Sequence, residues 1–337
     1  MNLSPMPLYE KILFFMDIIT AFLLSFIIIV LTRPQRNINL KSMYFSLYTV
    51  KCFIDLIMLI QFCFSMRMRK YGLLNWLIFE GGWCWFNLSK VTTIFHYYSK
   101  IVIYLSSICI AMNRLITVIY FVNHEQIWNR RRNSIICTIF IIAPLPYFIY
   151  MLADSNIVTW YSLSTSDSKV IRLHYNYITN YLTTVVDFLC CILSAIICLV
   201  IYFYIIFKLC KKKGNNVNKK ITVIGNITNI KVGNSELKLL LISLLLFMTL
   251  LLNAIIQGIT FYGQSINDTK LINQLNTISY PICDSLYMFT PYVLILSSSI
   301  VRKDIINLFW QPDKQKTSIE TLKTSKKSIS KKQNKNN

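Results

Sequence analysis

Six ionisable side chains stand inside long apolar stretches, where a charge is costly unless it is paired or used. They are Asp17, Lys51, Asp55, Lys100, Asp187 and Asp284. Acids and lysines in such places suit ion pairing or recognition of a small polar ligand. Catalysis is not indicated, because no HExxH or GxSxG motif occurs and the three histidines are far apart. We therefore expect no enzyme activity, no cofactor and no metal site.

Lys51 and Asp55 are the simplest pair among these residues. They are four positions apart, so on a helix they share one face and can neutralise each other. The sequence therefore predicts a structural ion pair in the middle of a helix bundle.

Lys100 is the best candidate for a ligand contact. Tyr97 and Tyr104 fall on the same helical face, at spacings of three and four. Polar residues on other apolar stretches could face them across a cavity: Asp187, Asn253, Gln257, Tyr280, Asp284 and Tyr287. Two interpretations are compatible: a cavity that binds a small molecule, or an ion pair between Lys100 and one of the two acids.

Seven apolar stretches of the length needed to cross a bilayer carry these residues. Hydrophobic residues make up 55% of the 337-residue chain and charged residues only 15%. The stretches cover about 8–31, 43–66, 91–121, 134–153, 178–207, 238–262 and 275–299. The sequence predicts an all-α membrane protein, with a seven-transmembrane helix bundle over residues 1–310.

The connections between these stretches also carry expectations. Residues 73–88 are apolar, short and rich in Trp, which predicts an outer loop lying on the bilayer. Residues 300–310 combine five apolar side chains near their end with the charged residues Arg302, Lys303 and Asp304, which predicts an amphipathic helix on the membrane surface. Residues 311–337 are rich in Lys and Ser, and we expect a disordered basic cytoplasmic tail.

The basic residues predict the orientation of the chain in the membrane. If the N-terminus is outside, 24 Lys and Arg residues lie on the inner side and six on the outer side. Such an excess is typical of cytoplasmic loops, so we expect the N-terminus outside and the C-terminus inside. The net charge of +21 then faces anionic membrane lipid and requires no nucleic acid.

Short motifs near two helix ends resemble those of a known family. The third stretch ends in SICIAMNRLIT (107–117), with Ile127-Trp128 after it, and the seventh ends in TPYVLILS (290–297), followed by Ile300-Val301-Arg302. This pattern resembles nematode serpentine chemoreceptors, and the gamma (Srg-like) class looks closest. The resemblance implies a G-protein-coupled receptor (GPCR) for a small chemical ligand, acting through a heterotrimeric G protein. It also implies signal transduction in sensory perception, at the plasma membrane and in the cilia of sensory neurons.

The resemblance also implies roles for three residues at the cytoplasmic end. In seven-helix receptors, an arginine like Arg114 is restrained at rest and reaches the G protein after activation. Asn113 replaces the acid that usually precedes this arginine, and Glu236 is placed to restrain it instead. Arg114 could equally reach lipid phosphates. A role for Asp55 in activation also stays open, because rhodopsin-like receptors keep a mid-bundle acid near this position.

Three cysteines carry further hypotheses. Cys84 lies in an outer segment and Cys63 is its nearby candidate partner for a disulfide. Cys210 precedes three lysines at the end of the fifth stretch, which suits palmitoylation, although such a run also serves as a stop-transfer signal.

The alternative function class is a multi-pass channel or transporter. That class favours charged rows along a pore, or internal repeats with broken helices. Here the acids are scattered and no repeat is visible.

Overall fold

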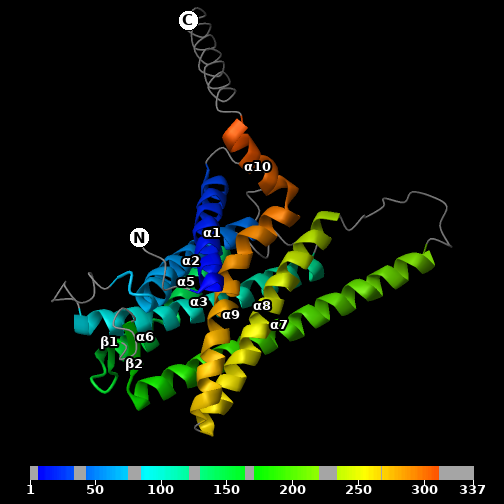
Figure 1. Ribbon diagram of the computed structural model, residues 1–337. Helices are drawn as coiled ribbons and strands as arrows, with labels where there is room; N and C mark the ends of the chain where they lie inside the picture. Colours follow the sequence, from blue (N-terminus) through cyan, green and yellow to red (C-terminus); the bar gives the residue numbers. More distant parts are fainter. Residues whose placement is uncertain are drawn as a thin grey trace, which may run out of the picture.

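The computed structural model describes residues 7–33, 43–74, 85–120, 130–163, 171–219, 234–266 and 268–310. These residues form long helices and one β-hairpin (Figure 1). The elements are α1 (Leu8–Thr32), α2 (Met43–Phe62), η2 (Cys63–Met68), α3 (Trp85–Ile119), α5 (Arg130–Ile142), α6 (Leu145–Ala153), β1 (Thr159–Leu163), β2 (Ile171–Tyr175), α7 (Tyr177–Lys219), α8 (Asn234–Ser265), α9 (Thr269–Ser297) and α10 (Ser299–Trp310).

Several of these helices can cross a membrane. Six helical stretches in the described residues are long and apolar enough, and α5 with α6 counts as one of them. A seventh is the pair Pro281–Leu296 and Val301–Asn307, bent by 83° between α9 and α10. Large apolar side chains such as Phe22 and Phe203 point outward. Because lipid, unlike water, accepts such a surface, the described residues form a membrane bundle of six to seven helices.

Helices that are neighbours in sequence also pack together. Contacts join α1 with α2, α2 with α3, α7 with α8 and α8 with α9, and α3 also packs along α7. One large apolar core runs through these helices and includes Leu24, Tyr48, Phe62, Ile103 and Tyr287. This packing brings polar residues on α2 and α3 close to those on α7, α8 and α9.

At the end of the bundle where α2 ends and α3 begins, the structure corrects one expectation and adds an element that was not expected. Residues 85–88, expected in an outer loop, belong to the first turn of α3. The rest of that segment, 75–84, lies outside the described residues. The β1–β2 hairpin was not expected from the sequence. Its strands pair antiparallel, from Thr159 opposite Tyr175 to Leu163 opposite Ile171. Ile171–Tyr175 does alternate apolar and polar residues, but Thr159–Leu163 does not, and five residues are a short stretch on which to predict a strand.

The end of α2 departs from regular α-helix. Residues Cys63–Met68 form η2, a π-helical segment with a wider turn. Arg67 lies within this segment and is buried in the bundle. Gly72 then adopts φ 70°, a left-handed conformation that glycine accepts without a steric cost, and the chain turns.

The hairpin is fastened to the end of the bundle by side chains of α3 and the end of α2. Ser89 Oγ donates to the Thr159 carbonyl at 2.8 Å, and the Thr92 hydroxyl lies 2.9 Å from that of Tyr161. Arg69 Nη1 donates to the Ile171 carbonyl at 2.8 Å. Burial raises the pKa of Tyr161, so its hydroxyl keeps its proton and its hydrogen bond at physiological pH.

We predict that Arg69→Ala loosens this hairpin. The substitution removes the hydrogen bond to Ile171 and the contact of the guanidinium with the Tyr161 ring, whose centroid is 5.5 Å away. A lost charged hydrogen bond at a buried carbonyl costs about 1–3 kcal/mol. We expect a lower melting temperature and faster proteolysis within residues 159–175. Arg131→Ala, at an exposed position on α5, is the control; equal proteolysis of both variants would contradict the anchoring role.

Candidate functional site

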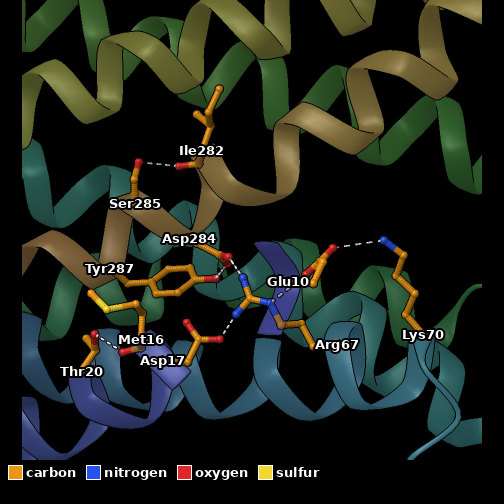
Figure 2. Close-up of polar contacts among 10 residues, drawn as sticks. All are labelled: Glu10, Met16, Asp17, Thr20, Arg67, Lys70, Ile282, Asp284, Ser285 and Tyr287. Carbon is orange, nitrogen blue, oxygen red and sulfur yellow. Dashed lines mark hydrogen bonds and ion pairs between the residues drawn. The ribbon is translucent and has the colours of Figure 1, made fainter. Parts of the chain in front are cut away.

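Arg67 lies at the centre of a buried group of charges, which we call the Arg67 cluster: Glu10, Asp17, Arg67, Lys70, Asp284 and Tyr287. Its guanidinium forms ion pairs with Asp17 on α1 and Asp284 on α9, and Nε donates to Glu10 Oε2 at 3.2 Å (Figure 2). Only 3% of Arg67 is exposed. One arginine therefore links three acids from two other helices, a geometry that suits its forked set of donors.

Tyr287 and Lys70 provide further contacts to two of the acids. The Tyr287 hydroxyl donates to Asp284 Oδ1, and Lys70 Nζ lies 3.3 Å from Glu10 Oε1. Lys70 keeps 39% of its side chain exposed, so the cluster reaches solvent at this one residue. Through Arg67 on η2, at the end of α2, the cluster joins α1 and α9 across the bundle.

Arg67 corrects a sequence-based assumption. It was counted with the outer-loop cations because the second apolar stretch was expected to end at residue 66. The helix instead continues through η2, and both Arg67 and Arg69 are buried. The end of the bundle that was expected to face outward thus carries less accessible positive charge than the sequence count assumed. The clue in the sequence was a set of acids in apolar stretches with too few cations to pair them.

Lys100 lies at the centre of a second group, which we call the Lys100 network: Lys100, Tyr104, Asp187, Cys191 and Asn253. Lys100 on α3 forms an ion pair with Asp187 on α7. Tyr104 donates to the other oxygen of that carboxylate at 2.8 Å, and Asn253 on α8 donates to the Tyr104 hydroxyl at 3.0 Å and to Cys191 Sγ at 3.1 Å. The network joins α3, α7 and α8, with every member buried.

The residues expected around one ligand cavity therefore divide between two groups. Tyr97, Lys100, Tyr104, Asp187 and Asn253 gather on α3, α7 and α8, with the Tyr97 ring centroid 5.7 Å from Lys100 Nζ. Asp284 and Tyr287 belong to the Arg67 cluster. Gln257 is half-buried one turn beyond Asn253, and the side chain of Tyr280 lies outside what the structure describes. Of the two expected acids, Asp187 is the one that pairs with Lys100.

Lys51 and Asp55 form a third, local ion pair. Lys51 Nζ lies 2.9 Å and 3.0 Å from the two oxygens of Asp55, and both side chains are buried. Because both residues are on α2, this pair neutralises charge without joining helices.

The far end of α3 carries the residues expected to couple to a G protein. Arg114 is buried, and Asn113 is fully buried with its amide nitrogen and oxygen lacking a hydrogen-bond partner among the described residues. Glu236 lies in the first turn of α8, and its side chain lies outside the described part. The restraint of Arg114 by Glu236 stays a prediction.

The cysteine hypotheses also stay predictions. Cys63 forms no disulfide among the described residues, and Cys84 lies outside them. Cys210 has an exposed thiol on α7, a position that a lipid-modifying enzyme could reach.

Comparison with known proteins decides the family. The model of the Srg family chemoreceptors matches residues 11–231, well over half of the chain. The chain belongs to the Srg family of chemoreceptors. The crystal structure of squid rhodopsin is similar in fold: the TM-score is 0.62 at 15% identity, over 91% of this Srg chain and 87% of the rhodopsin chain. A search of curated proteins found no match. The Srg chain therefore has a GPCR-like membrane fold, and the two buried groups lie within that fold.

We predict that Arg67→Ala destabilises the Srg chain strongly. The substitution leaves three buried carboxylates without their shared cation, and removing one partner of a buried ion pair costs about 3–5 kcal/mol. Arg67→Lys should recover only part of this loss, because an ammonium lacks the fork that reaches three acids. Melting temperatures in detergent measure both effects. Lys303→Ala, at an exposed position on α10, is the control. If the melting temperature of Arg67→Ala equals that of the wild type, the cluster does not stabilise the bundle.

Proposed function

We propose that the Srg chain is a chemosensory receptor that binds a small chemical ligand between its helices and activates a heterotrimeric G protein. The Lys100 network carries this proposal. It places a cation, a carboxylate, a phenol and an amide at membrane depth, on three different helices. Convergent polar groups inside an apolar helix bundle are typical of small-ligand sites.

The network gives a ligand a physical means of changing the bundle. In the resting arrangement, Asp187 accepts from both Lys100 and Tyr104, and Asn253 extends the chain of bonds to α8. A ligand with an anionic group competes for Lys100, and one with a cationic group competes for Asp187. Either ligand favours an arrangement in which α7 or α8 is no longer tied to α3, and it shifts the population by its difference in affinity.

The response is expected at the other end of α3. Arg114 lies 14 residues after Lys100, roughly 21 Å along the helix at 1.5 Å per residue. We infer that the Arg114 end faces the cytoplasm and the hairpin end faces outward, in the plasma membrane, as the distribution of basic residues favours. There Arg114 meets the G protein once helix α8 moves, and Glu236 restrains it at rest.

We expect Lys100→Ala to abolish the ligand response while the receptor still reaches the cell surface. The alanine leaves Asp187 with only Tyr104 as its partner within the network, so the ligand has no ion pair left to displace. The measurement is G-protein nucleotide exchange after a panel of small amines, acids and alcohols, with surface labelling to equalise expression. Lys303→Ala is the control. An unchanged dose–response curve for Lys100→Ala would overturn the assignment of this network.

Removal of the positive charge at position 114 should abolish nucleotide exchange without changing ligand binding. Arg114→Ala is compared with Arg131→Ala, which alters an exposed arginine near the same end of the bundle. In the same assay, Glu236→Ala should raise exchange without ligand, because it removes the proposed restraint. Full exchange by Arg114→Ala, or ligand-gated current in cells lacking G proteins, would refute the coupling and favour a channel.

A further inference from the structure

Within the part of the chain that the structure describes, the Arg67 cluster has one carboxylate more than it has cations. Ion pairs join three carboxylates, those of Glu10, Asp17 and Asp284, to the two cations Arg67 and Lys70. Lys70 is partly exposed, whereas the three acids are buried. An uncompensated negative charge at membrane depth is costly, so the cluster favours one further cation.

The position of the missing cation follows from the bonding of each acid. Both oxygens of Glu10 meet a cation, and both oxygens of Asp284 have a partner in Arg67 or Tyr287. Asp17 meets Arg67 through Oδ2 only. Its Oδ1 has no hydrogen-bond partner among the described residues, although the side chain is 98% buried. Asp17 Oδ1 is therefore the acceptor left for an additional donor.

A groove runs beside Asp17. It lies between α1 and α2, has a volume of about 380 Å³ and is lined by Asp17 together with apolar side chains. Among these, Ile18, Phe22, Ile60 and Phe64 are exposed on the outer face of the helices. The groove is therefore open toward lipid along its length. Asp17 is the one charged residue among those that line it.

A second groove of similar size provides a contrast. It lies between α7 and α8, has a volume of about 390 Å³ and is lined by Ile192, Leu199, Ile255 and similar residues, with no charged side chain. Such a groove offers only apolar contact to a lipid chain. What distinguishes the α1–α2 groove is the buried carboxylate in its wall.

We propose that the α1–α2 groove binds a protonated primary amine that carries an alkyl chain. The ammonium group donates to Asp17 Oδ1 and supplies the missing positive charge, and the alkyl chain lies along the apolar wall. A hard metal ion fits less well, because it requires several oxygen ligands. No group of three or more His, Cys, Asp or Glu side chains in the described residues is arranged to hold a metal ion. The amine enters from the bilayer, where its chain partitions.

This site is separate from the Lys100 network and does not depend on G-protein coupling. It joins α1 and α2, whereas the ligand of the proposed receptor function contacts α3, α7 and α8. Binding at the groove is measured without a signalling readout, so either proposal can fail while the other stands.

The test is equilibrium binding of tritiated n-octylamine to the full-length protein in lipid nanodiscs at pH 7. We expect saturable binding at one site, displaced by unlabelled n-octylamine and at least tenfold less effectively by n-octanol. Asp17→Asn should weaken binding at least tenfold. Its melting temperature should stay at or above that of the wild type, because the substitution leaves two acids and two cations in the cluster.

A pair of variants at one position tests the groove itself. Ala21 lines the groove, so Ala21→Phe should fill it and abolish binding, whereas Ala21→Ser should retain it. Equal displacement by n-octanol, or equal binding by Asp17→Asn, would show partitioning without charge recognition and overturn the proposal. If the wild-type protein is folded, as its thermal unfolding shows, but does not bind n-octylamine saturably, the proposal is also overturned. In that case a proton on Asp17 supplies the missing positive charge.

Discussion

Hydrocarbon cannot solvate a charge, and this constraint shapes the interior of the Srg chain. An ionisable side chain at membrane depth must find a partner, because an isolated charge there is costly. Arg67 meets acids from α1 and α9, and Lys100 meets Asp187 from α7. Arg67 and Lys100 therefore also fix which helices stand next to each other. The hydrophobic effect adds little to this choice within a membrane, because lipid is as apolar as a leucine side chain, whereas close van der Waals packing of the helices still contributes.

The two groups divide the bundle into two sets of three helices. The Arg67 cluster ties α1, α2 and α9, and the Lys100 network ties α3, α7 and α8. Packing between α2 and α3 and between α8 and α9 holds the sets together. Under the proposed function, a ligand acts on the Lys100 network and changes one set, while the Arg67 cluster keeps the other in place. This division gives the receptor a fixed part and a part that can move.

Local spacing explains which features could be predicted from the sequence. The apolar stretches are long enough to identify membrane helices. The spacing of four residues between Lys51 and Asp55 predicts an ion pair on one helical face. The partners of Arg67 could not be found in this way, because they come from helices far apart in sequence. Arg67 also lies within the π-helical segment η2, and no simple periodicity reveals such a segment. The β1–β2 hairpin was missed because its strands are short.

The receptor proposal depends most directly on the orientation of the bundle. The ligand must reach the Lys100 network from outside, and Arg114 must meet a G protein in the cytoplasm. The decisive measurement is antibody access to an epitope tag at either terminus, on intact and on permeabilised cells. The account predicts that the N-terminal tag is stained on intact cells and the C-terminal tag only after permeabilisation. The reverse pattern, or equal access to both tags on intact cells, would contradict it.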